Sequence, residues 1–325
     1  MNRRDAILAL AALGAPLPLI AQAPTKLPRI GLLVGGTSET AGHLVQAFIK
    51  GMADLGYKDG KNVHYELRYG DSSREKAERN ARELIAAQAD VLWAPSTLAA
   101  TAAQKATLSL PIVFAAVSDP VRSGIVKSLS RPATNASGIS LMSSEMAAKR
   151  IEVLNEIFPQ LKRLGVLHHP GDSASLSQLP YVQQGAKAFG KELKVVEART
   201  PEEFEAAFAK LVAWRADALM FLESSFTFTH RKVLLELATK RRWPTVTSSR
   251  EYAEAGAVVA YGADLEDAFR RSAAYVDKIL KGAKPSDLPV EQPTKFEFVI
   301  NLKAAKAMRL SIPQIVLLRA DRVIE

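Results

Sequence analysis

Hydroxyl and acidic residues recur at one kind of position in this chain, directly after short apolar runs. In the first half they are Thr37, Ser38, Ser96, Thr97, Ser118, Asp119 and Ser140, and in the second half Ser173, Ser175, Glu223, Ser225 and Tyr261. Hydroxyl groups and the free N–H groups at helix starts bind small polar or anionic ligands. The same residue types cap helices, so each residue alone has a structural explanation. The set predicts a binding site if the fold gathers these segments.

Two of these residues admit a second kind of chemistry. Asp119 and Glu223 could face each other across a cleft, and such a pair of carboxylates can act as acid and base on a sugar. Residues of this kind more often bind an amine or a hydroxyl group, or cap a helix. A secreted hydrolase is therefore kept as an alternative, and a binding protein that is not an enzyme is the preferred interpretation.

Residues for metal and cofactor chemistry are absent or badly spaced. The 325 residues include no cysteine, which excludes disulfides, thiolate metal sites and cysteine nucleophiles. None of the five histidines pairs at the i, i+4 spacing of a helical zinc site. No P-loop, no G-x-G-x-x-G after a strand and no G-x-S-x-G turn occurs. We therefore expect no cofactor and no metal.

The apolar runs before the hydroxyl-rich segments are typical of buried strands. RIGLLV from Arg29, Asp90–Trp93 and Ile112–Ala116 are short and apolar, and Asn62–Tyr69 alternates as a strand does. Between them, residues 41–55 and 73–88 repeat apolar residues at helical spacing. Alternating strands and helices predict an α/β fold with a parallel sheet and helices on both faces.

The second half of the chain repeats the first. RIGLLV at 29 matches RLGVLH at 163, ADVLWAPS at 89 matches ADALMFLE at 216, and LPIVFAAVSD at 110 matches WPTVTSSRE at 243. In each half, a strand with glycine near its start comes after these matched segments: SGISLMS from Ser137 and AGAVVAYG from Ala255. Matches in the same order predict two similar lobes. Ligands of such sheets bind beyond the carboxyl ends of the strands, which is where the hydroxyl-rich segments fall.

The charge of the chain points to no acidic macromolecule. Its 43 Lys and Arg residues against 34 Asp and Glu residues give a formal net charge of +9. Lys and Arg are mixed with Glu, as in residues 74–83, which is typical of a solvated helix face. No DNA-reading module precedes the two lobes, and we expect no nucleic-acid partner.

The first 23 residues, MNRRDAILALAALGAPLPLIAQA, have the three parts of a cleaved secretory signal. Arg3 and Arg4 precede an apolar run, and Ala21-Gln22-Ala23 offers small residues for cleavage. The arginine pair also fits a twin-arginine signal, so both export routes stay open. We expect a periplasmic protein.

Several long segments carry a more specific pattern: FIKGMADLGYKDGKNVHYELRYGD, LPIVFAAVSDPVRSGIVKSLSRPATNASGIS, AAKRIEVLNEIFP and KPSDLPVEQPTKFEFVINLKAAKAMRL. With these segments, nearly the whole chain resembles the substrate-binding components of ABC transporters. The resemblance is to the tryptophan/tyrosine-binding-like group, which has the type I periplasmic-binding fold. It implies two Rossmann-like lobes with parallel sheets, joined by crossover hinge strands, that close on a small solute.

The resemblance also implies boundaries and site walls. Residues 27–140 with 264–284 would form the first lobe, and residues 141–263 with 285–325 the second. Crossovers would fall near 138–141, 260–263 and 284–289. The first wall of the cleft would hold Thr37, Ser38, Ser96, Thr97, Ser118 and Asp119, and the second Ser173, Ala174, Ser175, Glu223, Ser225 and Tyr261.

The implied function is solute capture for import. The chain would act as a monomer, trap a small molecule and deliver it to a membrane permease and its ATPase. For an amino acid, helix starts would bind the carboxylate and Asp119 or Glu223 the ammonium group. The segment HPGDSAS departs from the Asn-rich turn of relatives, so branched-chain amino acids, nucleosides, sugars and small organic anions stay open. A ligand-sensing module coupled to a signalling receptor is the alternative.

Overall fold

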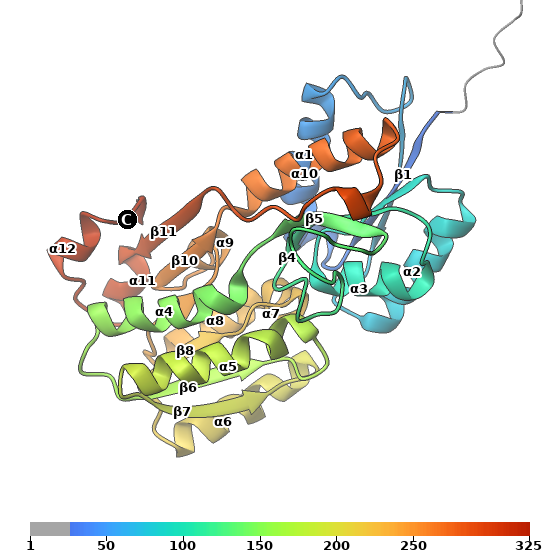
Figure 1. The fold of residues 1–325 in the computed structure, drawn as a ribbon. Helices are drawn as coiled ribbons and strands as arrows, with labels where there is room; N and C mark the ends of the chain where they lie inside the picture. Colours follow the sequence, from blue (N-terminus) through green and yellow to red (C-terminus); the bar gives the residue numbers. More distant parts are fainter. Residues whose placement is uncertain (1–26) are drawn as a thin grey trace, which may run out of the picture.

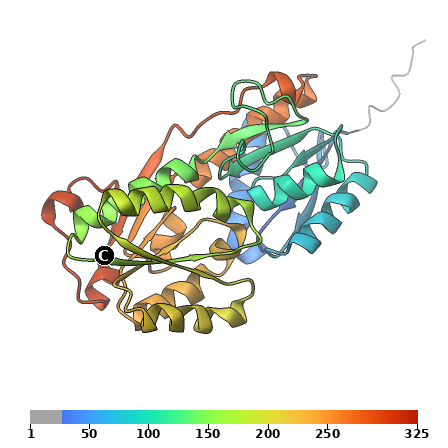
Figure 2. The same ribbon diagram turned by 60° about the horizontal axis from the view of Figure 1, so that its bottom comes forward.

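The computed structural model describes residues 27–325, and the signal predicted at residues 1–23 lies outside them. The described chain forms two α/β lobes, each built on its own sheet, as Figures 1 and 2 show. None of the helices within residues 27–325 is both long and apolar enough to cross a membrane.

The first lobe has a five-stranded sheet in the order β2-β1-β3-β4-β5, with every pair parallel. Its strands are β1 (Arg29–Val34), β2 (His64–Tyr69), β3 (Val91–Trp93), β4 (Ile112–Val117) and β5 (Ala136–Ser140). The helices between them are α1 (Ser38–Asp54), α2 (Arg74–Ala86) and α3 (Thr97–Ala106). Strands β1, β3, β4 and β5 are almost wholly buried, which explains why they are continuous apolar runs.

The second lobe has a seven-stranded sheet in the order β12-β11-β10-β9-β8-β6-β7. Its strands are β6 (Arg163–His168), β7 (Glu192–Glu197), β8 (Ala218–Phe221), β9 (Thr245–Thr247), β10 (Val259–Ala263), β11 (Phe296–Asn301) and β12 (Arg322–Ile324). Its helices are α4 (Ser143–Ile157), α5 (Ser173–Ala188), η1 (Pro201–Glu203), α6 (Phe204–Ala213), α7 (Ser225–Thr229), α8 (Arg231–Lys240), α9 (Arg250–Glu254), α11 (Leu302–Ala307) and α12 (Gln314–Leu317). Figure 2 shows helices above and below this sheet.

The strand orders confirm the predicted repeat. Strands β2-β1-β3-β4-β5 of the first sheet correspond to β7-β6-β8-β9-β10 of the second, so matched sequences occupy matched places. The second sheet then adds β11, which is antiparallel to β10 although the sequence predicts parallel pairing. The chain re-enters this lobe from the other one at β11, and its direction is therefore reversed.

Helix α10 (Leu265–Leu280) follows β10 but packs on the first lobe, beside α1 (Figure 1). The ring of Trp93 explains this return, since it is fully buried and donates its indole N–H to Ser272 of α10 at 2.9 Å. The same ring stacks on Phe48 of α1 with centroids 4.1 Å apart. The first sheet, α1 and α10 therefore pack around the same buried aromatic side chains.

The third crossover lies later than residues 284–289, where the sequence places it. After η2 (Pro285–Asp287), Ser137 of β5 donates to the carbonyl of Leu288 at 2.6 Å, and Ile139 pairs with Glu291. Residues 288–291 therefore lie along the edge of the first sheet, and the chain crosses only between Glu291 and β11. The crossover is later than predicted because this segment pairs with the backbone of β5. The spacing of apolar residues in the sequence does not reveal such pairing.

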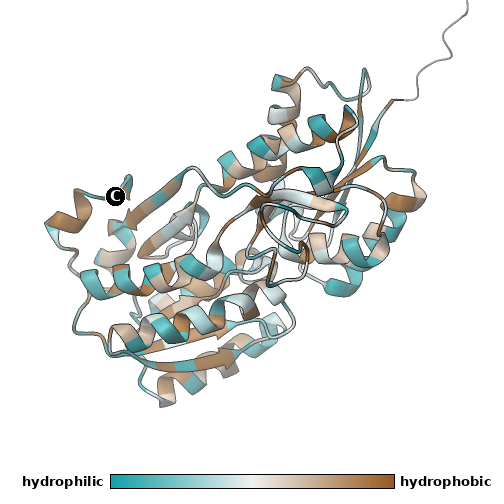
Figure 3. Cartoon of the chain, viewed as in Figure 1, coloured by the Kyte–Doolittle hydropathy of each residue, from teal (hydrophilic) through white to brown (hydrophobic). Residues whose placement is uncertain are grey.

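Apolar side chains fill separate cores in the two lobes. Figure 3 shows hydrophobic colour along the strands, while the helices carry both colours. One pair of core clusters forms between the first sheet and its helices, and another forms around the second sheet. Because each lobe has its own core, the lobes can move relative to each other about the crossovers.

Candidate functional site

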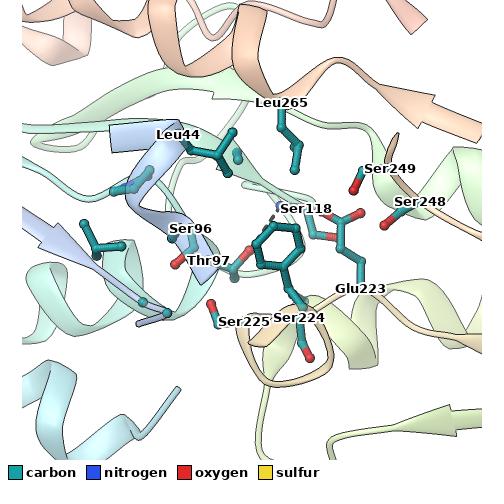
Figure 4. A pocket seen from close by; sticks show the side chains of 18 of the residues that line it. Leu44, Ser96, Thr97, Ser118, Glu223, Ser224, Ser225, Ser248, Ser249 and Leu265 are labelled. Carbon is teal, nitrogen blue, oxygen red and sulfur yellow. Dashed lines mark hydrogen bonds between the residues drawn. The ribbon is translucent and has the colours of Figure 1, made fainter. Parts of the chain in front are cut away.

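A cavity of about 80 Å³ lies between the two lobes. The first lobe and α10 line it with Val34, Gly35, Gly36, Ala41, Leu44, Pro95, Ser96, Thr97, Ala116, Ser118, Leu265 and Phe269, and the second lobe with Ala174, Glu223, Ser224, Ser225, Phe228, Ser248 and Ser249. Figure 4 shows Leu44 and Leu265 along one side and Ser96, Thr97 and Ser225 opposite them. The cavity therefore has an apolar side and a hydroxyl-rich side.

The first-lobe polar wall is the start of α3. Ser96 caps this ten-residue helix by accepting the N–H of Ala99, and Thr97 begins it. The Thr97 hydroxyl accepts the N–H of Ser118 at 3.1 Å, which joins the ends of β3 and β4. Ser118 is 1% exposed, and its own hydroxyl has no partner within the protein. An unpaired buried hydroxyl beside the N-terminus of α3 favours an anionic group in the cavity.

Glu223 dominates the second-lobe wall. Its carboxylate accepts the hydroxyl of Ser143 at 2.6 Å and lies 3.9 Å from a guanidinium nitrogen of Arg150. The side chain of Gln178 exchanges hydrogen bonds with the Glu223 backbone, which holds the residue at the cavity. Burial raises the pKa of Glu223 above its ordinary value; Arg150, Ser143 and Ser248 oppose this rise, and the nearby Glu251 adds to it. The arrangement provides a carboxyl group beside the cavity that, when ionised, is suited to a cationic group.

The apolar side of the cavity comes mainly from helices. Leu265 and Phe269 stand one turn apart on α10, and Leu44 projects from α1. Phe228 covers the cavity from the second lobe. Because these side chains offer no hydrogen-bonding group, this side of the cavity suits an apolar part of a ligand.

Contacts across the cleft hold the two lobes together. Ser72 of the first lobe lies 2.9 Å from the carbonyl oxygen of Ser225 and 2.8 Å from the hydroxyl of Thr229. Arg74 donates to the carbonyl of Gly171. A Cβ added at Gly35 would lie 2.4 Å from Ser96 Oγ and 2.7 Å from Ser225 Oγ. The lobes thus approach each other closely beside the cavity.

A second hollow of about 510 Å³ opens on the outer side of these contacts. It is lined by charged and aromatic residues of both lobes, among them Arg74, Asp172, Arg199 and His230. Asp172 caps α5 through the N–H of Ala174, and burial raises its pKa to about 6. Across residues 27–325 there is no cluster of three or more acidic or histidine side chains placed to hold a metal ion.

Five of the twelve predicted site residues line the cavity: Ser96, Thr97, Ser118, Glu223 and Ser225. They come from three different loops, those after β3, β4 and β8, so the fold does gather segments distant in sequence. The other seven do not line the cavity: Thr37, Ser38, Asp119, Ser140, Ser173, Ser175 and Tyr261. As ligand contacts these seven remain predictions.

Several of the seven make local structural contacts instead. Thr37 caps α1 in a reciprocal pair with Thr40. Asp119 accepts the N–H of Arg122 at 2.9 Å within its own turn, and Ser140 accepts the N–H of Met142 at 3.2 Å. Tyr261 packs edge-on against Phe298. These are the helix- and turn-capping roles that the same residue types serve elsewhere.

Other cavity residues were missed. Ser224, Ser248 and Ser249 belong to the hydroxyl-rich segments, and their position after β8 and β9 is the signal that could have found them. Leu44, Leu265 and Phe269 have ordinary helical spacing, which does not distinguish a core position from a cleft position. Arg150 lies within α4, where nothing in the sequence marks it as buried beside Glu223.

Comparison with known proteins places this geometry in a family. The family model for ABC transporter substrate-binding proteins matches residues 33–324. A tyrosine-binding protein of Clostridioides difficile is 28% identical over 279 residues, which are 85% of this chain and 80% of the relative.

Solved structures agree in fold. A conserved domain protein of Vibrio cholerae is 27% identical with a TM-score of 0.87, and an ABC domain from Streptococcus pneumoniae in complex with L-Trp is 24% identical with a TM-score of 0.86. Each comparison covers 92% of this chain and 100% of the other. The two-lobed fold, the cavity between the lobes and the match along almost the whole sequence lead to one conclusion: the chain belongs to the family of ABC transporter substrate-binding proteins.

Proposed function

We propose that this protein binds an L-α-amino acid with an apolar side chain and delivers it in the periplasm to a membrane permease and its ATPase. The observation that carries the proposal is Glu223, a carboxylate at a cavity whose opposite side is apolar. A sugar or nucleoside would leave that apolar side poorly used, and a simple organic anion would be repelled by the carboxylate.

Each part of an amino acid has a counterpart in the cavity. Glu223 would accept the ammonium group in a charge-assisted hydrogen bond. The start of α3, with the unpaired hydroxyl of Ser118, would bind the carboxylate. Leu44, Leu265 and Phe269 would surround the side chain. The name of the tyrosine-binding relative supports this class of ligand, and the signal predicted at residues 1–23 supports the periplasmic location.

The ligand class is tested by titration calorimetry with L-tyrosine, L-tryptophan, L-phenylalanine and L-leucine, beside glucose, adenosine and benzoate. We expect binding within the amino-acid group only. Glu223→Gln should weaken that binding by at least about tenfold, because a neutral amide replaces the charged partner of the ammonium group.

The control variant is Asp119→Asn, since Asp119 is the other carboxylate that the sequence offers for the ammonium group. It does not line the cavity, and its variant should keep the affinity of the original protein. A loss with Asp119→Asn and none with Glu223→Gln would reverse the assignment. Binding of glucose, adenosine or benzoate alone would reject the amino-acid class.

Delivery is tested separately in cells. Uptake of the labelled amino acid should fall when the gene is deleted and recover when it is restored. Unchanged uptake together with a lost signalling response to the same amino acid would favour the sensing alternative.

A further inference from the structure

We propose that Arg150 is a positioning residue that keeps Glu223 ionised and correctly oriented, although Arg150 does not line the ligand cavity. The inference rests on the proposed function for its meaning, because it concerns the group that would bind the ammonium. Its evidence, however, is the geometry around Glu223 without any ligand.

One face of α4 provides two partners of the Glu223 carboxylate, and Ser248 is a third. Ser143, the first residue of the helix, donates its hydroxyl at 2.6 Å, and Arg150, seven residues later, places a guanidinium nitrogen at 3.9 Å. Residues seven apart lie on the same side of a helix. Both contacts reach the same oxygen, Oε2, and so fix the carboxylate from two directions.

Arg150 is itself held from a third direction. Its Nε donates to the carbonyl of Tyr261 in β10 at 2.8 Å. A Cβ added at the next residue, Gly262, would lie 3.3 Å from the guanidinium and 1.9 Å from the carbonyl oxygen of Ser248. The guanidinium therefore occupies a narrow slot between α4 and β10, and it does not depend on Glu223 alone for its position.

Packing does not account for a charged residue here. Arg150 is 1% exposed, and its Nη1 has no partner within the protein. A buried guanidinium with an unpaired nitrogen costs stability that an apolar side chain of similar size would avoid. The compensating interaction is with Glu223, which is 17% exposed and would otherwise take up a proton in this setting.

The consequence is a division of roles around one carboxylate. Glu223 contacts the ligand, whereas Arg150 keeps Glu223 charged from behind the cavity wall. Because α4 starts directly after the first crossover and β10 ends at the second, the same contacts tie Glu223 to both connections between the lobes.

The first arm of the test needs no ligand. Arg150→Met keeps the approximate volume but removes the charge, and infrared spectroscopy at pH 7 should then detect an added band of protonated carboxyl, beyond any signal of the original protein. The added band should be absent from the double variant Arg150→Met with Glu223→Gln. Arg150→Lys restores a charge and should remove most of the band.

The second arm measures affinity against pH between about 6 and 9 for L-tyrosine and for its analogue without the amino group, 3-(4-hydroxyphenyl)propionate. Arg150→Met should weaken L-tyrosine binding about tenfold at pH 7, because a protonated Glu223 loses the charge-assisted hydrogen bond to the ammonium group. The loss should shrink as the pH rises, whereas binding of the analogue should change little.

The outcomes separate the two proposals. No added carboxyl band in Arg150→Met, or an equal loss for both probes at every pH, would overturn the role of Arg150. If the band appears but the original protein binds neither probe, or binds the analogue as tightly as L-tyrosine, the role of Arg150 stands and the assignment of Glu223 to an ammonium group fails.

Discussion

Glu223 and Arg150 lie next to each other, but the sequence indicates a functional position only for Glu223. Glu223 follows a buried strand directly, so its place at the cleft could be predicted. Arg150 stands in a helix beside Lys149 and near Glu152, a pattern typical of an exposed face. Only the packing of α4 on β9 and β10 shows that one of these charges points inward.

Capping and turn contacts account for three of the predicted site residues that do not line the cavity, Thr37, Asp119 and Ser140. Ser96 caps α3 and also lines the cavity, whereas Thr37 caps α1 and does not. Both residues follow strands and start helices, and their local sequences do not distinguish them. The difference depends on where the opposite lobe closes, which is a long-range property.

Asp172 should make stability depend on pH. Its pKa is about 6 in the folded protein against an ordinary 3.8, so the folded state binds more protons between these values and loses stability as the pH rises through them. Asp172→Asn removes the charge and still accepts the Ala174 N–H. It should therefore gain up to ~3 kcal/mol over the original protein between pH 4 and pH 7.

Urea unfolding of both proteins at the two pH values measures this gain. Asp287→Asn, at an exposed carboxylate in η2, is the control and should show no such pH-dependent difference. An Asp172→Asn protein that is less stable at pH 7 than at pH 4, relative to the original, would contradict the prediction.

At the scale of elements, short buried strands and amphipathic helices could be predicted closely. Strand β1 covers the residues of RIGLLV, and the predicted helix at 73–88 is observed as α2. The antiparallel pairing of β11 and the late third crossover could not be predicted, because both depend on hydrogen bonds between segments far apart in sequence. Apolar spacing carries information on burial, but not on strand direction.

The turn between β1 and α1 should tolerate no side chain at its first glycine. Gly35→Ala would displace Ser96 Oγ, which caps α3, and would meet Ser225 of the other lobe. We expect a loss of about 1 kcal/mol of stability from the damaged cap and a weaker affinity for the amino acid, because the closed arrangement is hindered.

Adding Ser225→Ala to Gly35→Ala separates the two effects. It should recover affinity but not stability, since Ser225 acts across the cleft and Ser96 within the first lobe. Gly42→Ala, inside α1 with only the Tyr69 hydroxyl at 3.9 Å, is the control and should lose neither affinity nor stability. Full affinity in Gly35→Ala would show that the lobes do not approach as described.

At the scale of the whole molecule, the two lobes are related by an internal repeat and joined at the crossovers. Ligand affinity then includes the free energy of closing them, in proportion to the ligand's preference for the closed arrangement. Contacts between the lobes that never touch the ligand should therefore change its apparent affinity.

Ser72 provides the test of this coupling. Ser72→Ala removes a hydroxyl that bridges to Ser225 and Thr229 of the other lobe, and about 1 kcal/mol lost from the closed form corresponds to about fivefold weaker binding. Lys232→Ala removes an exposed ion pair with Glu39 across the same cleft and should change little. Calorimetry with the amino acid that we propose as ligand compares the two variants, and equal affinities would argue against closure as part of the binding energy.

Trp93 gives the molecule an optical property that follows from its packing. Its indole lies edge-on to Phe269 with ring centroids 5.4 Å apart, and Phe269 lines the cavity. The other two tryptophans, Trp214 and Trp243, belong to the core of the second lobe and do not line the cavity. Trp93 is therefore separated from the cavity by a single aromatic ring, and we expect its fluorescence to change when the cavity is filled.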